Sequence, residues 1–334
     1  LDDNRNPLYL FALTPFMSGG PEDFAKAKLI SLAVAVGLVL LIFWMSLRLW
    51  GYDTAIAAAA IVALSPATAY MSRYVSADAL FAAAYCATVF VIAGPDDLRR
   101  SWPAWGALTA AAFLCKANGH LLFLTALACG LGRHGTAFLR SPAPWGAVAV
   151  FIALASFLLW RNAAVWGSPF HHYYTPIIWL QNHDESLLLR DTPVWNEIGP
   201  LWYLRNYTLG EAAGRFRDGL LAAGDAFLLG MSTGPEALWP RRAIGSLLLA
   251  AAGLGAGSLW REGRKNEVVA IAGTAGFFFL LFSWAAWRTP LRYIYPMVLS
   301  LTPLAVLGLG RCAGPRLRAQ LPWLGRRSCL TAAV

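Results

Sequence analysis

The sequence predicts an all-α fold, a polytopic bundle of transmembrane helices with short outer-face helices, and three observations carry the prediction of the bundle. Of its 334 residues 58% are hydrophobic, 13% are charged, and the mean hydropathy is +0.52, whereas soluble chains carry roughly 25% charged residues. Long apolar runs separated by short polar connections recur through most of the chain. Lys and Arg gather in some of these connections and are scarce in others, as expected where charge sets membrane orientation.

Nine apolar runs are candidates for membrane helices, because about 18 or more apolar residues can cross a bilayer. They cover residues 28–47, 54–70, 79–93, 104–115, 118–132, 144–160, 243–260, 268–287 and 292–310. The two short runs on either side of Lys116 predict a tight helical hairpin. We take residues 1–334 as one transmembrane domain with about nine or ten membrane segments.

Residues 6–17 are largely apolar but too short to span, and Pro15 would interrupt a helix near its end. They predict a short helix lying on the outer face of the membrane. The alternative is that they complete a span that begins further upstream.

The positions of Lys and Arg predict which connections face the cytoplasm, because short cytoplasmic loops carry the excess of both. If the helices alternate, one side receives Arg48, Arg99, Arg100, Arg133, Arg140, Arg261, Arg264, Lys265 and the basic tail Arg311, Arg316, Arg318, Arg326 and Arg327. The opposite, external side receives the N-terminal segment, the 73–78 loop, the Lys116 turn, an external loop over 161–241, and residues 287–292. The long loop is rich in Trp and Tyr, which predicts an aromatic belt at the headgroup level.

The formal net charge of +9 does not indicate a nucleic-acid partner. Nucleic-acid footprints cluster on one face, whereas these cations are scattered between apolar runs and act as topology signals. The cysteines form no CxxC pair or metal-finger spacing and are assigned no chemistry; they are Cys86, Cys115, Cys129, Cys312 and Cys329.

A lone acid, Asp78, stands between two apolar runs in the stretch from Ser72 to Asp78. A carboxylate at a membrane boundary is costly to bury, so it marks a candidate functional site. The alternative is that Asp78 caps the helix that follows, because Ser76 and Asp78 are both favourable N-cap residues. One residue can serve both purposes.

The order of four features resembles the GT-C membrane glycosyltransferases. These features are Asn6-Pro7-Leu8-Tyr9 on the outer side, a span ending in Arg48-Leu49-Trp50, the Tyr-x-x-x-Asp pattern of Tyr74 and Asp78, and Lys116 in a short outer hairpin. The nearest likeness is to the bacterial branch related to protein O-mannosyltransferases and lipid A aminoarabinose transferases. It covers residues 1 to about 165 best, and it rests on the order and sidedness of the motifs.

The resemblance implies an inverting transfer of a sugar from a polyprenyl phosphate donor to a lipid, glycan or protein acceptor. The reaction would take place on the external, periplasmic face of the cytoplasmic (inner) membrane. In the family the presumed base lies in an acidic first external loop, which we expect upstream of Leu1, together with the first helix. Asp2 and Asp3 stand too close to Pro7 to replace it, so the activity of this chain as it stands is uncertain.

Asp78 matches the second family acid, which implies a catalytic role or a place in a divalent-cation site beside the sugar phosphate. Lys116 matches a lysine that the resemblance places near the carrier phosphate. The alternative for Lys116 is snorkelling to the headgroups.

Four outer arginines, Arg73, Arg161, Arg288 and Arg292, are further candidates for phosphate contact, with interfacial anchoring as the alternative. Arg292 is the best of them, because Arg-Tyr-x-x-Pro resembles the start of a late family helix. Arg5-Asn6-Pro7 occupies the place where the aminoarabinose transferases have Glu-Lys-Pro. Asn6 cannot supply the charge of that lysine, so the resemblance implies that Arg5 supplies it. Tyr74 belongs to the same Tyr-x-x-x-Asp motif as Asp78. The external histidines His171, His172 and His183 match no ligand spacing and are read as solvated loop residues.

Other classes remain open. A transporter or lipid flippase would place ionisable residues and broken helices near the midplane, often in repeated halves. A surface-polysaccharide polymerase or ligase would share the substrates and sidedness. An inactive scaffold would follow if the acidic loop is missing.

Overall fold

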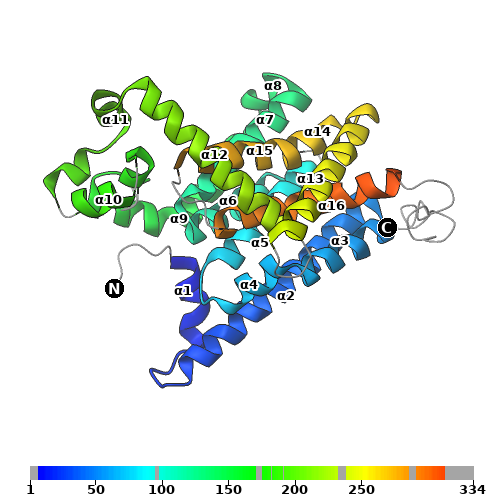
Figure 1. Cartoon of the computed structure of the whole chain (residues 1–334), viewed down its shortest axis with the longest axis horizontal. Helices are drawn as coiled ribbons and strands as arrows, with labels where there is room; N and C mark the ends of the chain where they lie inside the picture. Colours follow the sequence, from blue (N-terminus) through cyan, green and yellow to red (C-terminus); the bar gives the residue numbers. More distant parts are fainter. Residues whose placement is uncertain are drawn as a thin grey trace.

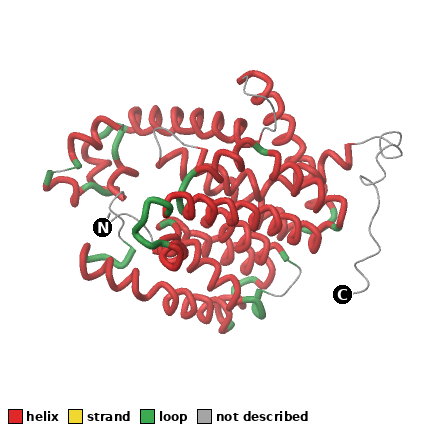
Figure 2. The backbone as a smooth tube through the Cα atoms, turned by 90° about the horizontal axis from the view of Figure 1, so that it is seen from below, coloured by secondary structure: helices red, strands yellow, loops and turns green. Residues whose placement is uncertain are grey.

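The computed structural model describes residues 7–94, 98–170, 175–181, 183–190, 192–231, 238–285 and 291–312. All regular structure within these residues is helical, as the tube drawing in Figure 2 shows. The predicted all-α class is therefore confirmed. Arg5, Asp2, Asp3, Arg288, His171 and His172 lie outside the described residues.

Within the described residues five helices are long and apolar enough to cross a membrane. They are α2 (Asp23–Trp50), α9 (Pro142–Trp166), α13 (Leu238–Arg261), the helix formed by α14 (Lys265–Val268), the π-helical turn η5 (Val269–Gly273) and α15 (Thr274–Ala285), and α16 (Leu291–Cys312). Shorter apolar helices include α5 (Asp78–Ala93) and α6 (Trp102–Cys115). All nine apolar runs are helical wherever they are described. The expected total of nine or ten crossing segments stays a prediction for the shorter helices.

The run 54–70, predicted as one helix, is divided into α3 (Tyr52–Leu64) and α4 (Pro66–Arg73), which bend by 55° at the break. Pro66 lacks a backbone N–H and cannot continue the hydrogen bonding of α3. Ser65 begins the second helix, because its side chain accepts a hydrogen bond from the Ala67 N–H at 3.2 Å. The bend turns α4 toward the start of α5, where Asp78 lies.

Helix α5 lies at the centre of the bundle and is buried along most of its length. It packs against α2, α6 and α16, as the arrangement in Figure 1 illustrates. Six of its 16 residues are Ala, and Phe81, Tyr85 and Phe90 are among its fully buried rings. A helix that is apolar all round is expected to be enclosed by other helices, so α5 can hold a polar group at either end in a fixed position.

Helices α13 and α16 approach so closely that glycines are required at their crossing. A Cβ on Gly255 would overlap the backbone of Leu304, and a Cβ on Gly308 would overlap that of Ala251. Small residues of this kind let membrane helices pack backbone to backbone. The contact fixes α16, whose first turn carries Arg292.

The connection 161–241, predicted as an external loop, is largely helical where the structure describes it, and most of its helices are short, as the expectation of short outer-face helices requires. After the end of α9 come η3 (Thr175–Trp179), α10 (His183–Leu189), η4 (Pro193–Glu197), α11 (Pro200–Asn206) and the long α12 (Leu209–Met231). We call η3, α10, η4 and α11 the outer subdomain. It has its own small core of Leu180, Trp195 and Ile198.

Two rings of this stretch, Trp195 and Tyr203, are buried and do not form part of the expected aromatic belt. Trp195 is 4% exposed and Tyr203 is 2% exposed. Trp195 belongs to the small core of the subdomain, and Tyr203 packs against the Trp284 ring, with centroids 5.4 Å apart. They are therefore turned inward and away from the surrounding solvent or lipid.

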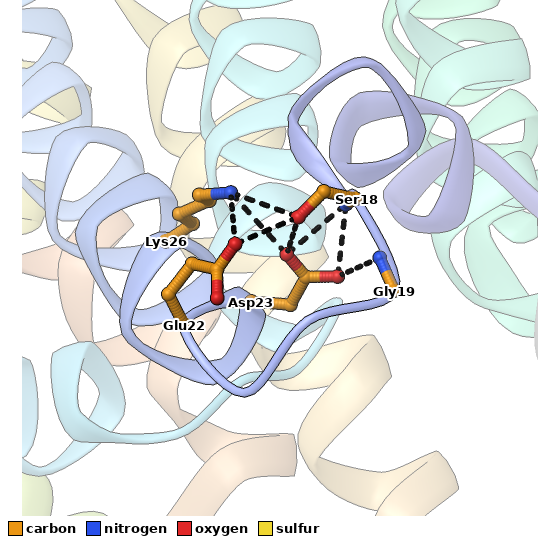
Figure 3. A network of polar contacts seen from close by, with 5 residues as sticks. All are labelled: Ser18, Gly19, Glu22, Asp23 and Lys26. Carbon is orange, nitrogen blue, oxygen red and sulfur yellow. Dashed lines mark hydrogen bonds and ion pairs between the residues drawn. The ribbon is translucent and has the colours of Figure 1, made fainter.

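The predicted N-terminal helix is present as α1 (Pro7–Leu13) followed by η1 (Thr14–Phe16). A polar turn joins it to α2, where the Asp23 carboxylate accepts hydrogen bonds from the Ser18 N–H at 3.0 Å and the Gly19 N–H at 2.8 Å (Figure 3). Beyond the turn, the hydroxyls of Tyr9 and Ser31 are hydrogen-bonded at 2.8 Å. These bonds hold α1 against α2; its location at the membrane surface stays a prediction.

Contacts across the bundle divide the connections into two faces. On one face Lys116 contacts both Asp78 and Tyr293. On the other, Arg264 donates to the Leu49 carbonyl at 2.9 Å, and Arg133 donates to the Gly94 carbonyl at 3.1 Å. The connections that were expected to share a side therefore meet in space. In Figure 1, α1 lies toward one end of the molecule and the end of α16 toward the other.

Candidate active site

Asp78 is the first residue of α5 and is 6% exposed. Its Oδ2 accepts a hydrogen bond from the Ser76 hydroxyl at 2.9 Å, and that hydroxyl accepts from the Asp78 N–H at 3.4 Å. The N-cap position itself belongs to Ala77, which makes no side-chain capping bond. The Asp78 carboxylate therefore does not cap the helix, and it contacts the Ser76 hydroxyl and the Lys116 ammonium instead.

Lys116 provides the partner of Asp78. It lies between α6 and η2 (Ala117–Leu121) in an extended conformation with φ −149° and ψ 136°. Its Nζ forms an ion pair with Asp78 Oδ1, and the side chains of the two residues are 16% and 8% exposed. The turn behind it is tight, because a Cβ on Gly119 would overlap the backbone of Ala112. The ammonium thus points toward the bundle and an acid, where snorkelling would direct it toward the headgroups.

Aromatic rings flank the Lys116 ammonium. Its Nζ lies 4.6 Å from the centroid of the Tyr293 ring and 5.2 Å from that of Phe81. A ring face attracts a cation through its quadrupole. Tyr293 also stacks on Phe282, with centroids 5.2 Å apart and planes 28° apart. From the sequence, Tyr293 was recognisable only as the Tyr of the Arg-Tyr-x-x-Pro pattern. The neighbouring Arg292 was the one signal that pointed to this position.

Arg292 lies beside this group at the start of α16. Its guanidinium carbon is 5.1 Å from the Tyr293 ring centroid, and Nη2 donates a long bond of 3.5 Å to the Tyr293 hydroxyl. It also interacts electrostatically with Asp78 and Tyr70. The site therefore brings two cations to one described carboxylate, an arrangement with a net positive charge.

The remaining predicted residues lie around or outside this group. Tyr74 ends α4, is 51% exposed, and places its ring 4.7 Å from that of Tyr70. Arg73 is exposed and forms no ion pair with a described residue. Arg161 donates at 3.4 Å to Asn162. The structure therefore unites Asp78, Lys116 and Arg292, with Tyr74 nearby.

The described residues form no metal site from His, Cys, Asp and Glu side chains alone. Within the described ranges no group of three or more such side chains is close enough to hold a metal ion. Asp78 is bonded to Lys116 and Ser76, and an ammonium beside a carboxylate repels a second cation. The divalent cation beside Asp78 stays a prediction.

A second buried cation, Arg215 of α12, joins the outer subdomain to the bundle. Its Nη2 donates to the Ile178 carbonyl at 2.7 Å, and its guanidinium carbon lies 5.1 Å from the Trp284 ring and 5.5 Å from the Tyr203 ring. Burial lowers the pKa of Arg215, while the neighbouring Tyr203 opposes that shift. Nothing in the spacing of the sequence identified Arg215, because its partners lie in separate elements.

Comparisons with known proteins bear on the fold of the chain. Residues 5–160 match the family model described as dolichyl-phosphate-mannose-protein mannosyltransferase. The fold is similar to that of ArnT from Cupriavidus metallidurans bound to undecaprenyl phosphate, with a TM-score of 0.54 and 17% identity over 95% of this chain and 52% of that chain. The chain therefore has the polytopic helical GT-C fold.

The apo structure of the same ArnT gives a TM-score of 0.51 at 16% identity, over 95% of this chain and 51% of that one. This chain thus spans about half the length of the ArnT chains that it matches. No curated protein sequence matches it significantly. The GT-C resemblance expected from the motif order is confirmed, and the apolar helices together with the fold identify an integral membrane protein.

Proposed function

We propose that this chain is a membrane glycosyltransferase that moves a sugar from a polyprenyl phosphate donor to an acceptor hydroxyl on a lipid, glycan or protein. One observation carries the proposal: the Asp78–Lys116 pair, with Arg292 beside it, lies at one end of a GT-C bundle. A related fold, that of ArnT, has been solved with undecaprenyl phosphate bound. The proposed location is the cytoplasmic (inner) membrane, with the site on the external face.

The two cations suit a lipid-linked phosphate. Guanidinium matches phosphate oxygens in a bidentate manner, and an ammonium adds a compact point charge. Lys116 and Arg292 both approach the Tyr293 ring, at 4.6 Å and 5.1 Å from its centroid, so one phosphate beside that ring can contact both. As the sugar leaves, the phosphate gains negative charge, which fixed cations in a dry site stabilise strongly.

Asp78 is then the proton acceptor available among the described groups. When a phosphate attracts the Lys116 ammonium, the pair with Asp78 weakens and the carboxylate becomes a stronger base. The acceptor oxygen attacks the anomeric carbon from the face opposite the phosphate, forming one C–O bond as the other breaks. The bonding pair leaves on the phosphate and the hydroxyl proton moves to Asp78, which inverts the anomeric configuration. General base help of this kind is worth roughly 10² to 10⁴ in rate.

The test is transfer from radiolabelled polyprenyl phosphate sugars in membranes that contain this chain, expressed alone and together with the sequence that flanks it in its gene. Label should appear in a lipid, glycan or protein fraction, and only when the chain is present. Movement of the labelled donor across sealed vesicles without transfer would instead identify a flippase. No transfer with any sugar from either form would leave the inactive scaffold.

A further inference from the structure

The outer subdomain and the first residue of α12, which follows it, expose large apolar side chains that the core of the subdomain does not use. Five leucines of α10, α11 and the start of α12 are more than half exposed: Leu187 57%, Leu188 76%, Leu201 69%, Leu204 67% and Leu209 84%. Single exposed leucines are ordinary, but a group of them on a small unit marks a contact surface. We call these five residues the leucine face.

The leucine face is distinct from the core of the outer subdomain. In α10, Ser186 is buried and Leu189 packs against the core while Leu187 and Leu188 face outward. In α11, Tyr203 is buried while Leu201 and Leu204 are exposed. Leu201 and Leu204 are three positions apart and so lie on one face of α11, while the neighbouring Leu187 and Leu188 are the exposed apolar residues of α10.

A positive charge accompanies the apolar side of α11. Arg205 is exposed and follows Leu201 by four positions, which places it on the same face. Leucines next to an exposed cation are typical of helices that lie in the membrane interface, where the cation meets anionic headgroups. A protein-binding face would more commonly use aromatic anchors, whereas Trp195 and Tyr203 are buried here.

The surroundings of the subdomain are continuous with a lipid-facing surface. It follows α9, a candidate spanning helix whose last turns expose Phe157 and Trp160, by 60% and 71%. In Figure 1, α10 and α11 project from the end of the molecule where α1 lies, beyond the end of α9. Neither α10 nor α11 is long enough to cross the bilayer itself.

We propose that the leucine face rests on the outer leaflet, with its leucines at the boundary of headgroups and acyl chains and Arg205 among anionic phospholipid headgroups. The inference is independent of the transferase proposal. It adds a leucine contact to the aromatic contact expected from the sequence, to which the buried Trp195 and Tyr203 do not contribute. Its consequence is that the subdomain is held at a fixed depth above the site formed by Asp78 and Lys116.

The test places a fluorescent thiol label on the face and reads its surroundings. In a background with Cys312 and Cys329 changed to Ser, Leu188→Cys and Leu204→Cys are labelled with an environment-sensitive dye; the remaining described cysteines are buried. The matched control is Glu197→Cys on η4, an exposed position in the same subdomain. The proteins are placed in vesicles of phosphatidylethanolamine and phosphatidylglycerol, with and without a lipid that carries a shallow doxyl quencher.

The expected result is strong quenching of the two leucine-face labels by the doxyl lipid and weak quenching by aqueous iodide, with the reverse for the control. Arg205→Gln should reduce doxyl quenching at the Leu204 position more in phosphatidylglycerol vesicles than in neutral ones. Iodide quenching as strong as in the control would overturn the proposal. Shelter from both quenchers would also overturn it, because protein would then cover the face.

Discussion

Charged side chains lie at both ends of helix α5, but their bonding partners differ between the two ends. At the C-terminal end, Arg133 Nη2 donates to the carbonyls of Ile92 at 3.0 Å and Gly94 at 3.1 Å. At the N-terminal end, Asp78 pairs with Lys116, and Lys116 otherwise faces aromatic rings. The first arrangement satisfies carbonyls that a helix end leaves unpaired, whereas the second gathers charges that no helix end requires.

A second connection on the same face as Arg133 also uses its charged side chains to bond groups at helix ends. Arg264 bonds to Glu267 at 2.5 Å and to the Leu49 carbonyl at 2.9 Å, and Trp50 donates to Glu267 at 3.0 Å. These bonds join the end of α2 to the start of α14. Charge on this face therefore closes helix ends, while charge on the opposite face, with two cations to one described acid, is available to an anionic ligand.

The largest effect should come from Asp78→Asn. The amide keeps the size of the side chain and cannot accept a proton, so transfer should fall by roughly 10² to 10⁴. The measurement is sugar transfer per inserted protein. Asp218→Asn is the control, because Asp218 forms an exposed pair with Arg217. Turnover unchanged in Asp78→Asn would reduce Asp78 to a structural role.

The same change leaves a buried ammonium without its partner, which can destabilise a protein by about 3–5 kcal/mol. The double variant with Asp78→Asn and Lys116→Met separates the two causes. It should recover thermal stability relative to Asp78→Asn and remain inactive. Recovery of activity along with stability would show that folding alone was lost.

Next in size is Lys116→Met, which should weaken binding of polyprenyl phosphate. Hydrogen bonds to charged groups are worth about 1.5–3 kcal/mol, so the affinity should fall roughly 10- to 100-fold. Binding to the purified protein in detergent is the measurement, and insertion should be preserved. Lys26→Met is the control, because Lys26 pairs with Glu22 on the surface at 3.3 Å. Equal affinity in Lys116→Met and the parent would exclude a role for Lys116 in phosphate binding.

These residues also show how much the sequence could predict. Apolar runs and the distribution of cations predicted the helices and their two faces, because both signals are local. Asp78, Lys116 and Arg292 were identifiable singly by their charge beside apolar runs. The sequence could not predict that these residues pair, that the Tyr293 ring lies beside two of them, or that Arg215 contacts aromatic rings. Each of these contacts depends on which helices cross.

The stretch 161–241 was predicted as one external connection, but its individual helices were not, because these short helices carry no long apolar period. Trp195 and Tyr203 were expected at the membrane surface because such rings favour headgroups, but both are buried, and that burial depends on tertiary packing. Which leucines of α10 and α11 stay exposed depends on the same packing, so they could not be identified from the sequence.

A smaller effect, on stability alone, is expected from Glu267→Gln on the opposite face. The change weakens the charged bond to Arg264, so the protein should lose about 1–3 kcal/mol of stability. Thermal unfolding in detergent measures this loss, and affinity for polyprenyl phosphate should not change. If affinity fell together with stability, the separation of a structural face from a binding face would be wrong.

The smallest effect concerns Tyr293, and it tests whether the ring itself holds the two cations. Tyr293→Phe keeps the ring face, and the only described bond of the hydroxyl to Arg292 is long at 3.5 Å, so affinity should stay within about twofold because exposed, weak bonds contribute little. Tyr293→Leu removes the quadrupole, which is worth about 0.5–2 kcal/mol, so affinity should fall by roughly 2- to 30-fold. Equal losses in both variants would assign the role to the hydroxyl, and no loss in either would mean that Lys116 and Arg292 are positioned by Asp78 and the backbone alone.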